Sequence, residues 1–424
     1  MLFREISEIW TTSPCRLNIV DFFELMGERP FAFLYGGGSK SRWLIFGEDP
    51  ILVMTELTQN MPRFSRLGTL PPIFPDFIGH VSYEYNHWHD PFISKPIDKP
   101  FPFPDCYLVI YRTIHIYDIK MELLYKATRS GFEAPCAVVA NGNVNNGLFK
   151  AHKIWDSDTS AGYRDKVEKI RQEIAMGNVY QVNLTRQERW CFSGDLKQFA
   201  LRLFEANPAP FSALMVGSDF SIISSSPERF FEISRGKILT SPIKGTAARG
   251  DNLWADELFK RNLLASSKDR SELAMIADLM RNDLTKICQM PSVCVDVFPR
   301  LESYANVHHL VADISGTLLP EVSLESLFVA LFPGGSITGC PKIAAMNLIR
   351  ELEVSPRMVY TGALGWLSCD LSQADFNIAI RTVCASHDEL IFGVGGGVIW
   401  DSEPYSEYQE TVHKASSIIK CLTY

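Results

Sequence analysis

The order of strand-like and helix-like segments constrains the fold of this chain most strongly. Short apolar runs separated by prolines and glycines fill residues 1–150, as in "RPFAFLYGG", "RWLIFGEDP", "HVSYEY" and "CYLVIYRTIHIYDI". Later strands are expected at "VYQVNLT", "FSIISSSPERFFEISRGKILTSPIKGT", "VYTGALGWLS", "FNIAIRTVCA" and "LIFGVGGGVIW". Because these strands cluster and do not alternate strictly with helices, the pattern predicts an α+β fold with mostly antiparallel sheet.

Helices are expected at 269–289, 323–331, 341–352 and 402–422. A further helix is marked by Tyr163, Val167, Ile170 and Ile174, which recur at helical spacing before Gly177. Arg235-Gly236 has the composition of a hairpin turn. The polar, glycine-rich "NGNVNNG" at 141–147 separates a β-rich region, 1–150, from a second region, 151–424.

Composition excludes several classes of function. The chain has 424 residues, of which 46% are hydrophobic, and carries a net charge of -8 without a basic stripe. Nucleic acid and anionic membrane are therefore not expected as partners. The ten cysteines show no CxxC spacing, which fits reduced thiols in the cytoplasm and no zinc site. We expect neither a signal peptide nor a transmembrane span.

Two pairs of acidic residues have the spacing of one helix face. Asp269 and Glu272 are three residues apart, as are Glu407 and Glu410, and Lys414 follows Glu410 by one further turn. Each pair alone is most simply a solvated helix face. If the pairs met, each repulsion at ~5 Å would cost roughly 3 kcal/mol, which a divalent cation with oxygen ligands such as Mg2+ would offset.

Two glycine-rich segments can bring the backbone close to a ligand. "FPGGSITGCPK" (332–342) leads into an expected helix whose first amides suit an anion, but it is not a Walker A loop. "GVGGGVIW" (393–400) is not followed by the βαβ unit of a dinucleotide site. Its glycines therefore form either a tight strand-to-helix loop or a close backbone contact with a ligand.

Four single residues are ambiguous by themselves. Arg381 next to the apolar run "FNIAI" needs a carboxylate, from either a salt bridge or a ligand. His309 and Glu228 are, taken singly, a structural histidine and a turn acid. Lys244 in "TSPIKGTAARG" is either solvated or in contact with a substrate.

Together these segments resemble the chorismate-utilising enzymes, a family that includes anthranilate, aminodeoxychorismate, isochorismate and salicylate synthases. The matching segments occur in family order between about 160 and 416, and they are "GNVYQVNLT", "SSSPERF", "SPIKGTAARG", "DRSELAMIADLMRNDL", "VHHLVADISGTL", "LFPGGSITGCPK", "YTGALGW", "FNIAIRT" and "GVGGGVIWDSEPYSEYQETVHK". The match over the first 150 residues is weak. The resemblance implies a two-layered α+β assembly of antiparallel sheets flanked by helices.

The resemblance also implies roles for individual residues. Glu272 and Glu410 would ligate Mg2+ directly and Asp269 and Glu407 through water, so that the ion holds the ring carboxylate of chorismate. Glu228 would be the general acid at the C4 hydroxyl, and His309 would lie against the ring. The enolpyruvyl side would contact Arg381, Tyr360, Gly395 and Gly397, and the pocket would be lined by Gly245, Thr246, Ser336 and Lys414.

Two positions distinguish the branches of the family. Members that add water have a lysine where this chain has Gln181, and glutamine cannot act as that base. Anthranilate synthases typically have alanine where this chain has Lys244, whereas aminodeoxychorismate synthases share its "PIKGT". The resemblance therefore favours amination of chorismate at C4 through a covalent Lys244 adduct, a step of p-aminobenzoate and folate synthesis.

Some implications concern partners and alternatives. No nucleophile-elbow cysteine of the GxCxG kind is present, so ammonia is expected from a separate glutamine amidotransferase subunit. Some relatives bind tryptophan in the N-terminal half, where this chain has "FLYGGGSKSRW" and lacks the Leu-Leu-Glu-Ser element of feedback-inhibited members. The alternatives are anthranilate synthase component I and a non-catalytic regulatory subunit.

Overall fold

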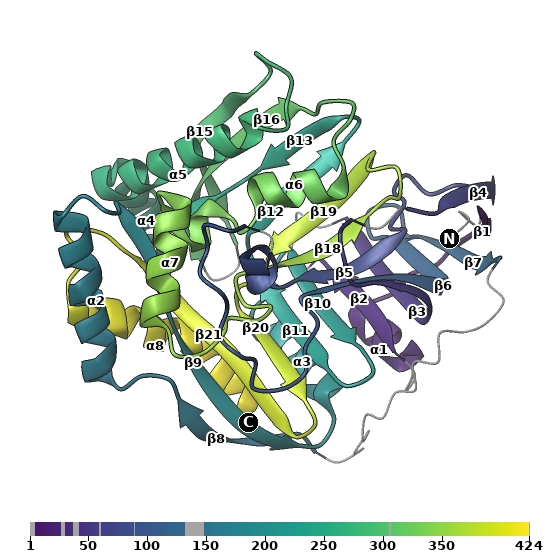
Figure 1. The fold of residues 1–424 in the computed structure, drawn as a ribbon. Coiled ribbons are helices and arrows are strands. Elements are labelled where there is room, and N and C mark those ends of the chain that lie inside the picture. The colour runs from purple at the N-terminus through teal and green to yellow at the C-terminus, as the bar shows by residue number, and fades with distance from the viewer. Residues whose placement is uncertain are drawn as a thin grey trace.

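The computed structural model describes residues 5–26, 30–36, 42–58, 61–88, 90–131, 148–304 and 307–423. The expected regional boundary at 141–147 lies outside these residues. The described chain is rich in strands and carries helices on the outside of the sheet (Figure 1). The predicted α+β class is confirmed.

Strands of the N-terminal region are β1 (Glu5–Pro14), β2 (Phe31–Tyr35), β3 (Trp43–Met54), β4 (Arg63–Gly68), β5 (Phe77–Val81), β6 (Cys106–Asp118) and β7 (Leu123–Ser130). The remaining strands are β8 (Lys150–Asp156), β9 (Gln181–Ser193), β10 (Phe211–Val216), β11 (Ser221–Ser226), β12 (Arg229–Ser234), β13 (Lys237–Thr240), β14 (Ile243–Ala248), β15 (Cys294–Ser303), β16 (Val307–Thr317), β17 (Gly339–Cys340), β18 (Ala363–Leu367), β19 (Gln373–Ile378), β20 (Thr382–Ser386) and β21 (Glu389–Val398).

The helices are α1 (Ile19–Leu25), α2 (Ser160–Ala175), α3 (Leu196–Ala206), α4 (Leu253–Ala265), α5 (Ser267–Thr285), α6 (Leu324–Leu331), α7 (Lys342–Leu352) and α8 (Pro404–Leu422). Short 3-10 turns occur at Tyr83–Trp88 and Gly335–Ile337. No helix among the described residues combines the length and apolar character needed to cross a bilayer.

Hydrogen bonds join the strands of both regions into one sheet system. The pairings are antiparallel except for β1 with β4, which run parallel. β2 pairs with β10 and β5 with β18, so the N-terminal strands extend the sheet of the second region. The long pair β9–β21 runs from Val182 opposite Val398 to Cys191 opposite Glu389. Helix α8 packs against β21 of this pair.

Helices α2, α5 and α8 follow from their sequence patterns. Tyr163, Val167 and Ile170 are the buried residues of α2, and the chain leaves this helix at Gly177, whose φ is +79°. Ser266 caps α5 by accepting from the amide of Asp269. Pro404 starts α8, where the Glu403 carboxylate accepts from the next two amides.

The strand prediction for "FNIAIRTVCA" was wrong in one respect. β19 ends at Ile378 and β20 begins at Thr382, so Arg381 lies in the link between two strands and does not end one. Its φ of +50° takes the backbone out of the extended region, and no glycine or proline marks this break in the sequence.

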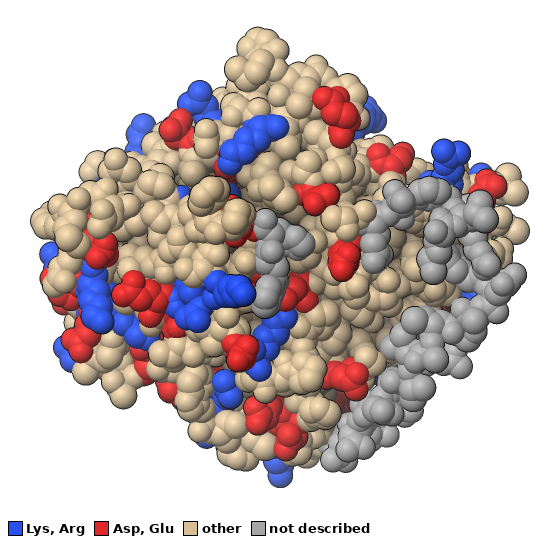
Figure 2. Space-filling model, in the orientation of Figure 1, with Lys and Arg blue, Asp and Glu red and all other residues tan. Residues whose placement is uncertain are grey.

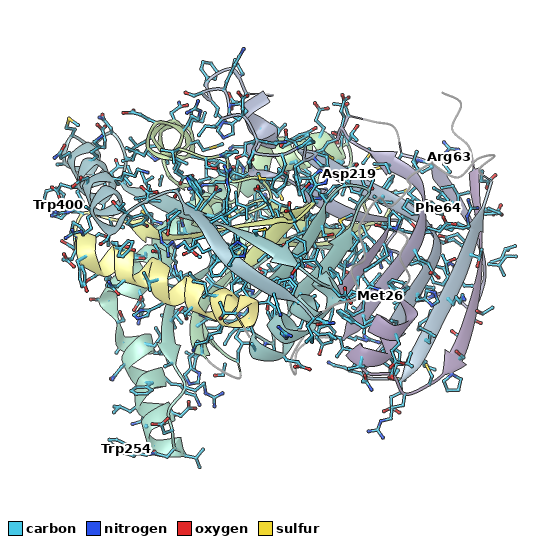
Figure 3. All side chains as sticks on the ribbon, turned by 90° about the horizontal axis from the view of Figure 1, so that it is seen from below. Met26, Arg63, Phe64, Asp219, Trp254 and Trp400 are labelled. Atoms are coloured by element: carbon cyan, nitrogen blue, oxygen red, sulfur yellow. The ribbon has the colours of Figure 1, made fainter. Side chains whose placement is uncertain are left out.

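Three helices were not expected. α1 lies among the N-terminal strands, α3 packs against α8, and α4 follows the β14 loop, where Asn252 caps its first turn. Figure 3 shows α4 projecting from the body with Trp254 at its far end, and both Leu253 and Trp254 are exposed. Only Asp256 and Leu263 of α4 are buried, so its sequence lacks the broad apolar stripe that predicts a helix.

Candidate active site

The predicted catalytic side chains meet where β14, the 335–337 turn and the β11–β12 link come together. Ser336 Oγ donates a hydrogen bond of 2.8 Å to Glu228 Oε1. Lys244 Nζ lies 3.4 Å from the main-chain oxygen of Ser336. Glu228 and Ser336 are buried and Lys244 is partly buried, so Glu228 is not the surface turn acid that its sequence position alone suggests.

Burial shifts the ionisation of both reactive groups toward their neutral forms. It raises the pKa of Glu228, although the Ser336 hydroxyl and the Lys244 charge act in the opposite direction. Burial likewise lowers the pKa of Lys244 against the opposing effects of Glu272 and Glu228. The pair therefore combines a carboxyl that can keep its proton with an amine that can lose one.

The next residues along β14 face α5 and β16. Gly245 has a φ of +76°, and a Cβ there would lie 2.9 Å from the Asp269 side chain, so this approach requires glycine. Thr246 Oγ1 lies 2.9 Å from His309 Nδ1. His309 lies inside β16, and burial lowers its pKa to about 4, so its ring is neutral near neutral pH.

Arg381 lies close to His309. Both line a small cavity of about 20 Å³ together with Tyr304 and Pro227. Among the described residues, no carboxylate forms an ion pair with the Arg381 guanidinium, and burial lowers its pKa. This leaves a partly buried cation available to a carboxylate that the chain itself does not supply.

A side chain of α8 and the Tyr360 side chain both contact the backbone of the β21 glycines. Lys414 Nζ donates to the main-chain oxygen of Gly395 at 2.9 Å and to Glu410 Oε1 at 2.6 Å. The buried Tyr360 also hydrogen-bonds the backbone of Gly395, and burial raises its pKa to about 12. A Cβ on Gly397 would lie 3.4 Å from Lys244 Nζ, so this glycine borders the amine directly.

The two acid pairs converge at the mouth of this site. A Cβ on Gly396 would lie 3.3 Å from both Glu407 Oε2 and Glu410 Oε1. Burial raises the pKa of Glu272, with Asp269 and Glu410 contributing repulsion. The pKa of Glu407 is also raised, first by burial and then by Glu410. The acidic faces of the two helices therefore lie close together, which the sequence alone could not decide.

These four acids are candidate ligands for Mg2+. Glu407 Oε2 is buried and, within the described part of the chain, has no hydrogen-bond partner. The donors are all carboxylate oxygens, the ligand type Mg2+ prefers. Among the described residues, no three His, Cys, Asp or Glu side chains are placed to hold a metal ion together. Glu272 and Glu410 instead pair with Lys268 and Lys414, at 4.0 and 2.6 Å. The residues fit such an ion, and their ligand roles stay a prediction.

Some residues at the site were not predicted. Arg357 and Glu353 form a buried ion pair of 2.6 Å. The Arg357 guanidinium also donates to the main-chain oxygens of Ile337 and Asn183, at 2.9 and 2.6 Å. It thereby ties the 335–337 turn to β9 directly behind the catalytic groups. No local pattern predicts this connection, since Ile337 and Asn183 are 20 and 174 residues away from Arg357 in the sequence.

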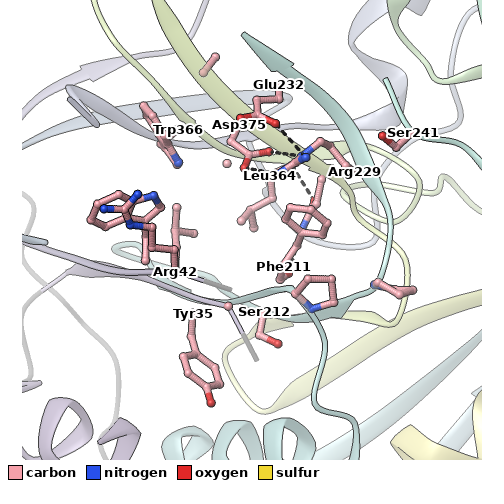
Figure 4. Close-up of a pocket in the computed structure, with 18 of the residues that line it drawn as sticks. Tyr35, Arg42, Phe211, Ser212, Arg229, Glu232, Ser241, Leu364, Trp366 and Asp375 are labelled. Carbon is pink, nitrogen blue, oxygen red and sulfur yellow. Dashed lines mark hydrogen bonds and ion pairs between the residues drawn. The ribbon is translucent and has the colours of Figure 1, made fainter. Parts of the chain in front are cut away.

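A larger cavity of about 360 Å³ lies where the N-terminal strands meet β10, β18 and β19, and it shares Pro227 and Tyr304 with the small cavity of His309 and Arg381. Figure 4 shows Arg229 in this cavity, paired with Asp375 and Glu232 at 3.0 and 2.8 Å. Tyr35, Arg42, Phe211 and Trp366 complete much of its wall. None of the predicted catalytic residues lines it.

The charge distribution agrees with the sequence. On the face drawn in Figure 2, lysine and arginine are interspersed with aspartate and glutamate. No broad basic area appears on that face, as the net charge of -8 suggests.

Comparison with known proteins defines the class. The sequence model of the chorismate binding enzyme family matches residues 36–420, and the chain belongs to this family. The chain is 34% identical to aminodeoxychorismate synthase component 1 of Bacillus subtilis over 82% of its length and 78% of the relative.

Two further relatives show the breadth of the similarity. Anthranilate synthase component 1 of Saccharolobus solfataricus is 31% identical over 90% of this chain and 87% of its own. The structure of the menaquinone-specific isochorismate synthase of Escherichia coli superposes with a TM-score of 0.78 at 17% identity, covering 99% of this chain and 95% of that one. The last similarity shows the shared fold.

Proposed function

We propose that this enzyme converts chorismate and ammonia to 4-amino-4-deoxychorismate, with Lys244 as a covalent nucleophile. The observation that carries the proposal is the group formed by Lys244, Ser336 and Glu228, in which an amine with a lowered pKa lies beside a carboxyl with a raised one. The similarity to aminodeoxychorismate synthase component 1 supports the same assignment.

The reaction follows from these two protonation states. The uncharged Lys244 amine adds to C2 of the ring, the ring double bonds shift, and the C4–O bond breaks as Glu228 protonates the departing hydroxyl, which leaves as water. The new C2 ammonium returns one proton to Glu228. Ammonia then forms the C4–N bond, the double bonds shift back, and the C2–N bond to Lys244 breaks. Glu228 protonates the departing lysine nitrogen, which leaves as the neutral amine, and the C4 ammonium of the product returns one proton to Glu228.

The remaining residues would hold the substrate. Arg381, unpaired among the described residues, would take the enolpyruvyl carboxylate together with Tyr360 and the Gly395 and Gly397 backbone. Gly245, Thr246, Ser336 and Lys414 would line the pocket, and the neutral His309 would lie against the ring. Mg2+, held directly by Glu272 and Glu410 and through water by Asp269 and Glu407, would supply positive charge for the ring carboxylate.

Ammonia would come from a separate glutamine amidotransferase subunit. The name "component 1" of the relatives implies that those proteins have a partner component. The product would serve p-aminobenzoate and folate synthesis in the cytoplasm, with pyruvate removed by a separate lyase.

A second candidate is the reaction of anthranilate synthase component 1. The observation that favours it is the similarity to the Saccharolobus protein, which covers more of this chain than the Bacillus relative does. The two reactions are separated by product identification from chorismate, ammonia and Mg2+. The proposal predicts 4-amino-4-deoxychorismate, and fluorescent anthranilate would support the alternative.

A further inference from the structure

The link that carries Tyr360, residues 357–362, has an unusual backbone conformation. Met358 and Thr361 have φ values of +57° and +60°, in the left-handed region that favours glycine. Residues other than glycine keep such a conformation only where the surrounding structure enforces it. Contacts from outside the link must therefore hold Tyr360 in its position.

The 3-10 turn Tyr83–Trp88 of the N-terminal region supplies such contacts. Glu84 Oε1 accepts a hydrogen bond of 2.7 Å from the main-chain amide of Arg357, which is 273 residues away in the sequence. The amide of Tyr83 donates to the Met358 main-chain oxygen at 2.8 Å. The Arg357 guanidinium lies over the Tyr83 ring, 4.6 Å from its centre. Two neighbouring residues of the turn thus bind two neighbouring residues of the link.

The strand that leads into this turn also lies against the link. Val81 of β5 pairs with Ala363 of β18. A Cβ on Gly362 would collide with the Val81 main-chain oxygen, so this approach requires glycine. Both ends of the link are therefore held by the N-terminal region.

The contact at Arg357 reaches Tyr360 within one turn of chain. The Tyr360 amide donates to the Arg357 main-chain oxygen at 3.1 Å. The Tyr360 side chain packs on β21, where a Cβ on Gly393 would lie 2.5 Å from its ring, and it hydrogen-bonds the backbone of Gly395. A displacement of the chain at Arg357 therefore moves the Tyr360 side chain relative to the β21 glycines.

We propose that Glu84 is a positioning residue for the substrate site, because its carboxyl oxygen fixes the backbone at Arg357 and thereby sets the place of Tyr360. The N-terminal region then contributes to the affinity for chorismate without touching it. The inference rests on the proposed function only through the contact between Tyr360 and chorismate.

Glu84 acts as a hydrogen-bond acceptor in this role, and its charge is not required. Burial, and then the charge of Asp105, raise the pKa of Glu84 to about 8, so the carboxyl group is largely protonated near pH 7. A protonated carboxyl still presents an oxygen to the Arg357 amide. A neutral side chain of the same length with an acceptor oxygen should therefore replace it.

Kinetics with chorismate as the varied substrate test the proposal. Glu84→Met keeps the length of the side chain and loses the acceptor, so we expect the KM for chorismate to rise roughly three- to tenfold. The Arg357 guanidinium keeps its bonds to Glu353 and to the Ile337 oxygen, so kcat should change less than about twofold. Glu84→Gln presents an amide oxygen at the same place and should stay within about twofold of the unmodified enzyme in both constants.

A double-mutant cycle with Tyr360→Phe separates positioning from a merely structural role. Removal of the Tyr360 hydroxyl should itself raise the KM for chorismate. If Glu84 acts through Tyr360, adding Glu84→Met to Tyr360→Phe should raise the KM by less than about twofold. A structural role would give the same fold-change of the KM in both backgrounds.

Glu8→Gln is the control for a loss of stability in the N-terminal region. Glu8 is also a buried carboxyl group there, but its ion pairs with Arg66 and Arg129 stay within that region. This variant should lower the midpoint of thermal unfolding without a change in the KM for chorismate. If Glu84→Met does not fold, Tyr83→Leu takes its place, since it removes the ring beneath the Arg357 guanidinium, and the same rise in KM is expected.

The outcomes separate this inference from the proposed function. The KM is measured as loss of chorismate, so it does not depend on the product. If the product is not 4-amino-4-deoxychorismate, the proposed function is wrong and the KM still decides the role of Glu84. If no chorismate is consumed, the proposed function is also wrong, and the dissociation constant of chorismate replaces the KM. An unchanged KM in folded Glu84→Met, equal effects of Glu84→Gln and Glu84→Met, or an additive cycle would overturn the positioning role.

Discussion

Ser336 connects to the proposed general acid through its hydroxyl, which donates to Glu228 at 2.8 Å. Its main-chain oxygen lies 3.4 Å from Lys244 Nζ. One residue of a short 3-10 turn therefore contacts both groups that exchange a proton in the proposed reaction. Arg357 holds this turn by donating to the Ile337 main-chain oxygen. The position of the turn determines how Glu228 and Lys244 are arranged.

Replacing Ser336 by alanine should shift the alkaline limb of the rate profile. Glu228 must be protonated to act, so the rate falls as pH rises through its pKa. The Ser336 hydroxyl stabilises the ionised carboxylate and lowers that pKa. Its removal should move the alkaline limb of kcat to higher pH, whereas Glu228→Gln should lose roughly 10²–10⁴ in kcat at every pH. An unmoved limb in Ser336→Ala would show that Glu228 does not control it.

The acid limb reports on Lys244. The amine must be neutral, so the rate rises with pH through its lowered pKa. Burial is the main cause of this lowering, and the positive charge of Lys414 adds to it. Lys414→Met should therefore raise the Lys244 pKa and move the acid limb to higher pH. Profiles of the variant and the unmodified enzyme are compared at the same ammonium concentrations, so that titration of ammonium affects both equally. A shift to lower pH would contradict this account.

Removal of one carboxylate should stabilise the protein without metal. The pKa of Glu272 is raised in the folded state, so stability is lost as pH rises from the unfolded pKa of this carboxyl through its folded pKa. At neutral pH, Glu272→Gln should raise the midpoint of thermal unfolding by about 1–2 °C in EDTA. The unmodified protein should gain stability on addition of MgCl2, and the variant should lose most of that gain. An equal MgCl2 response in both proteins would exclude Glu272 as a ligand.

Arg381 should determine the affinity for chorismate. A guanidinium without an internal carboxylate partner is expected to pair with the substrate, so Arg381→Ala should raise the KM for chorismate roughly 10- to 100-fold. Arg229→Lys is the control, because Arg229 is paired internally with Asp375 and Glu232 and does not line the small cavity of Arg381. The KM should stay unchanged in that variant. A normal KM in Arg381→Ala would remove Arg381 from the binding site.

The Arg357–Glu353 pair should be important for stability. Arg357→Met leaves the buried Glu353 without its main partner and should lower the free energy of unfolding by about 3–5 kcal/mol in urea titrations. The double variant with Glu353→Gln should lose less than the sum of the single changes, since it removes both charges. Additive losses would mean that the two residues act independently.

Local patterns predicted the elements that depend on neighbours in the sequence. The spacing of Tyr163, Val167 and Ile170 identified α2, and the acid spacing placed Asp269 and Glu272 on one helix face, with Glu407 and Glu410 on another. The hairpin turn at Arg235 and Gly236 was also correct, with φ values of +52° and +74° between β12 and β13.

Features that depend on distant contacts could not be predicted in this way. The buried Glu228 accepts a hydrogen bond from Ser336, which is 108 residues away in the sequence. The break at Arg381 carries no glycine or proline signal, and the partners of Arg357 on β9 are 174 residues away. The alternation of Gln181, Asn183, Thr185 and Gln187 was readable as a polar strand face, but only the glycines of β21 show that this face borders Lys244.

The central claim is that Lys244 forms a bond to the ring. It is tested most directly by identifying the product formed from chorismate, ammonium chloride and Mg2+ by the unmodified enzyme and by Lys244→Ala. We predict 4-amino-4-deoxychorismate from the unmodified enzyme and none from the variant, with both proteins folded. Full amination at C4 by Lys244→Ala would contradict the covalent mechanism, and anthranilate from the unmodified enzyme would contradict the proposed reaction.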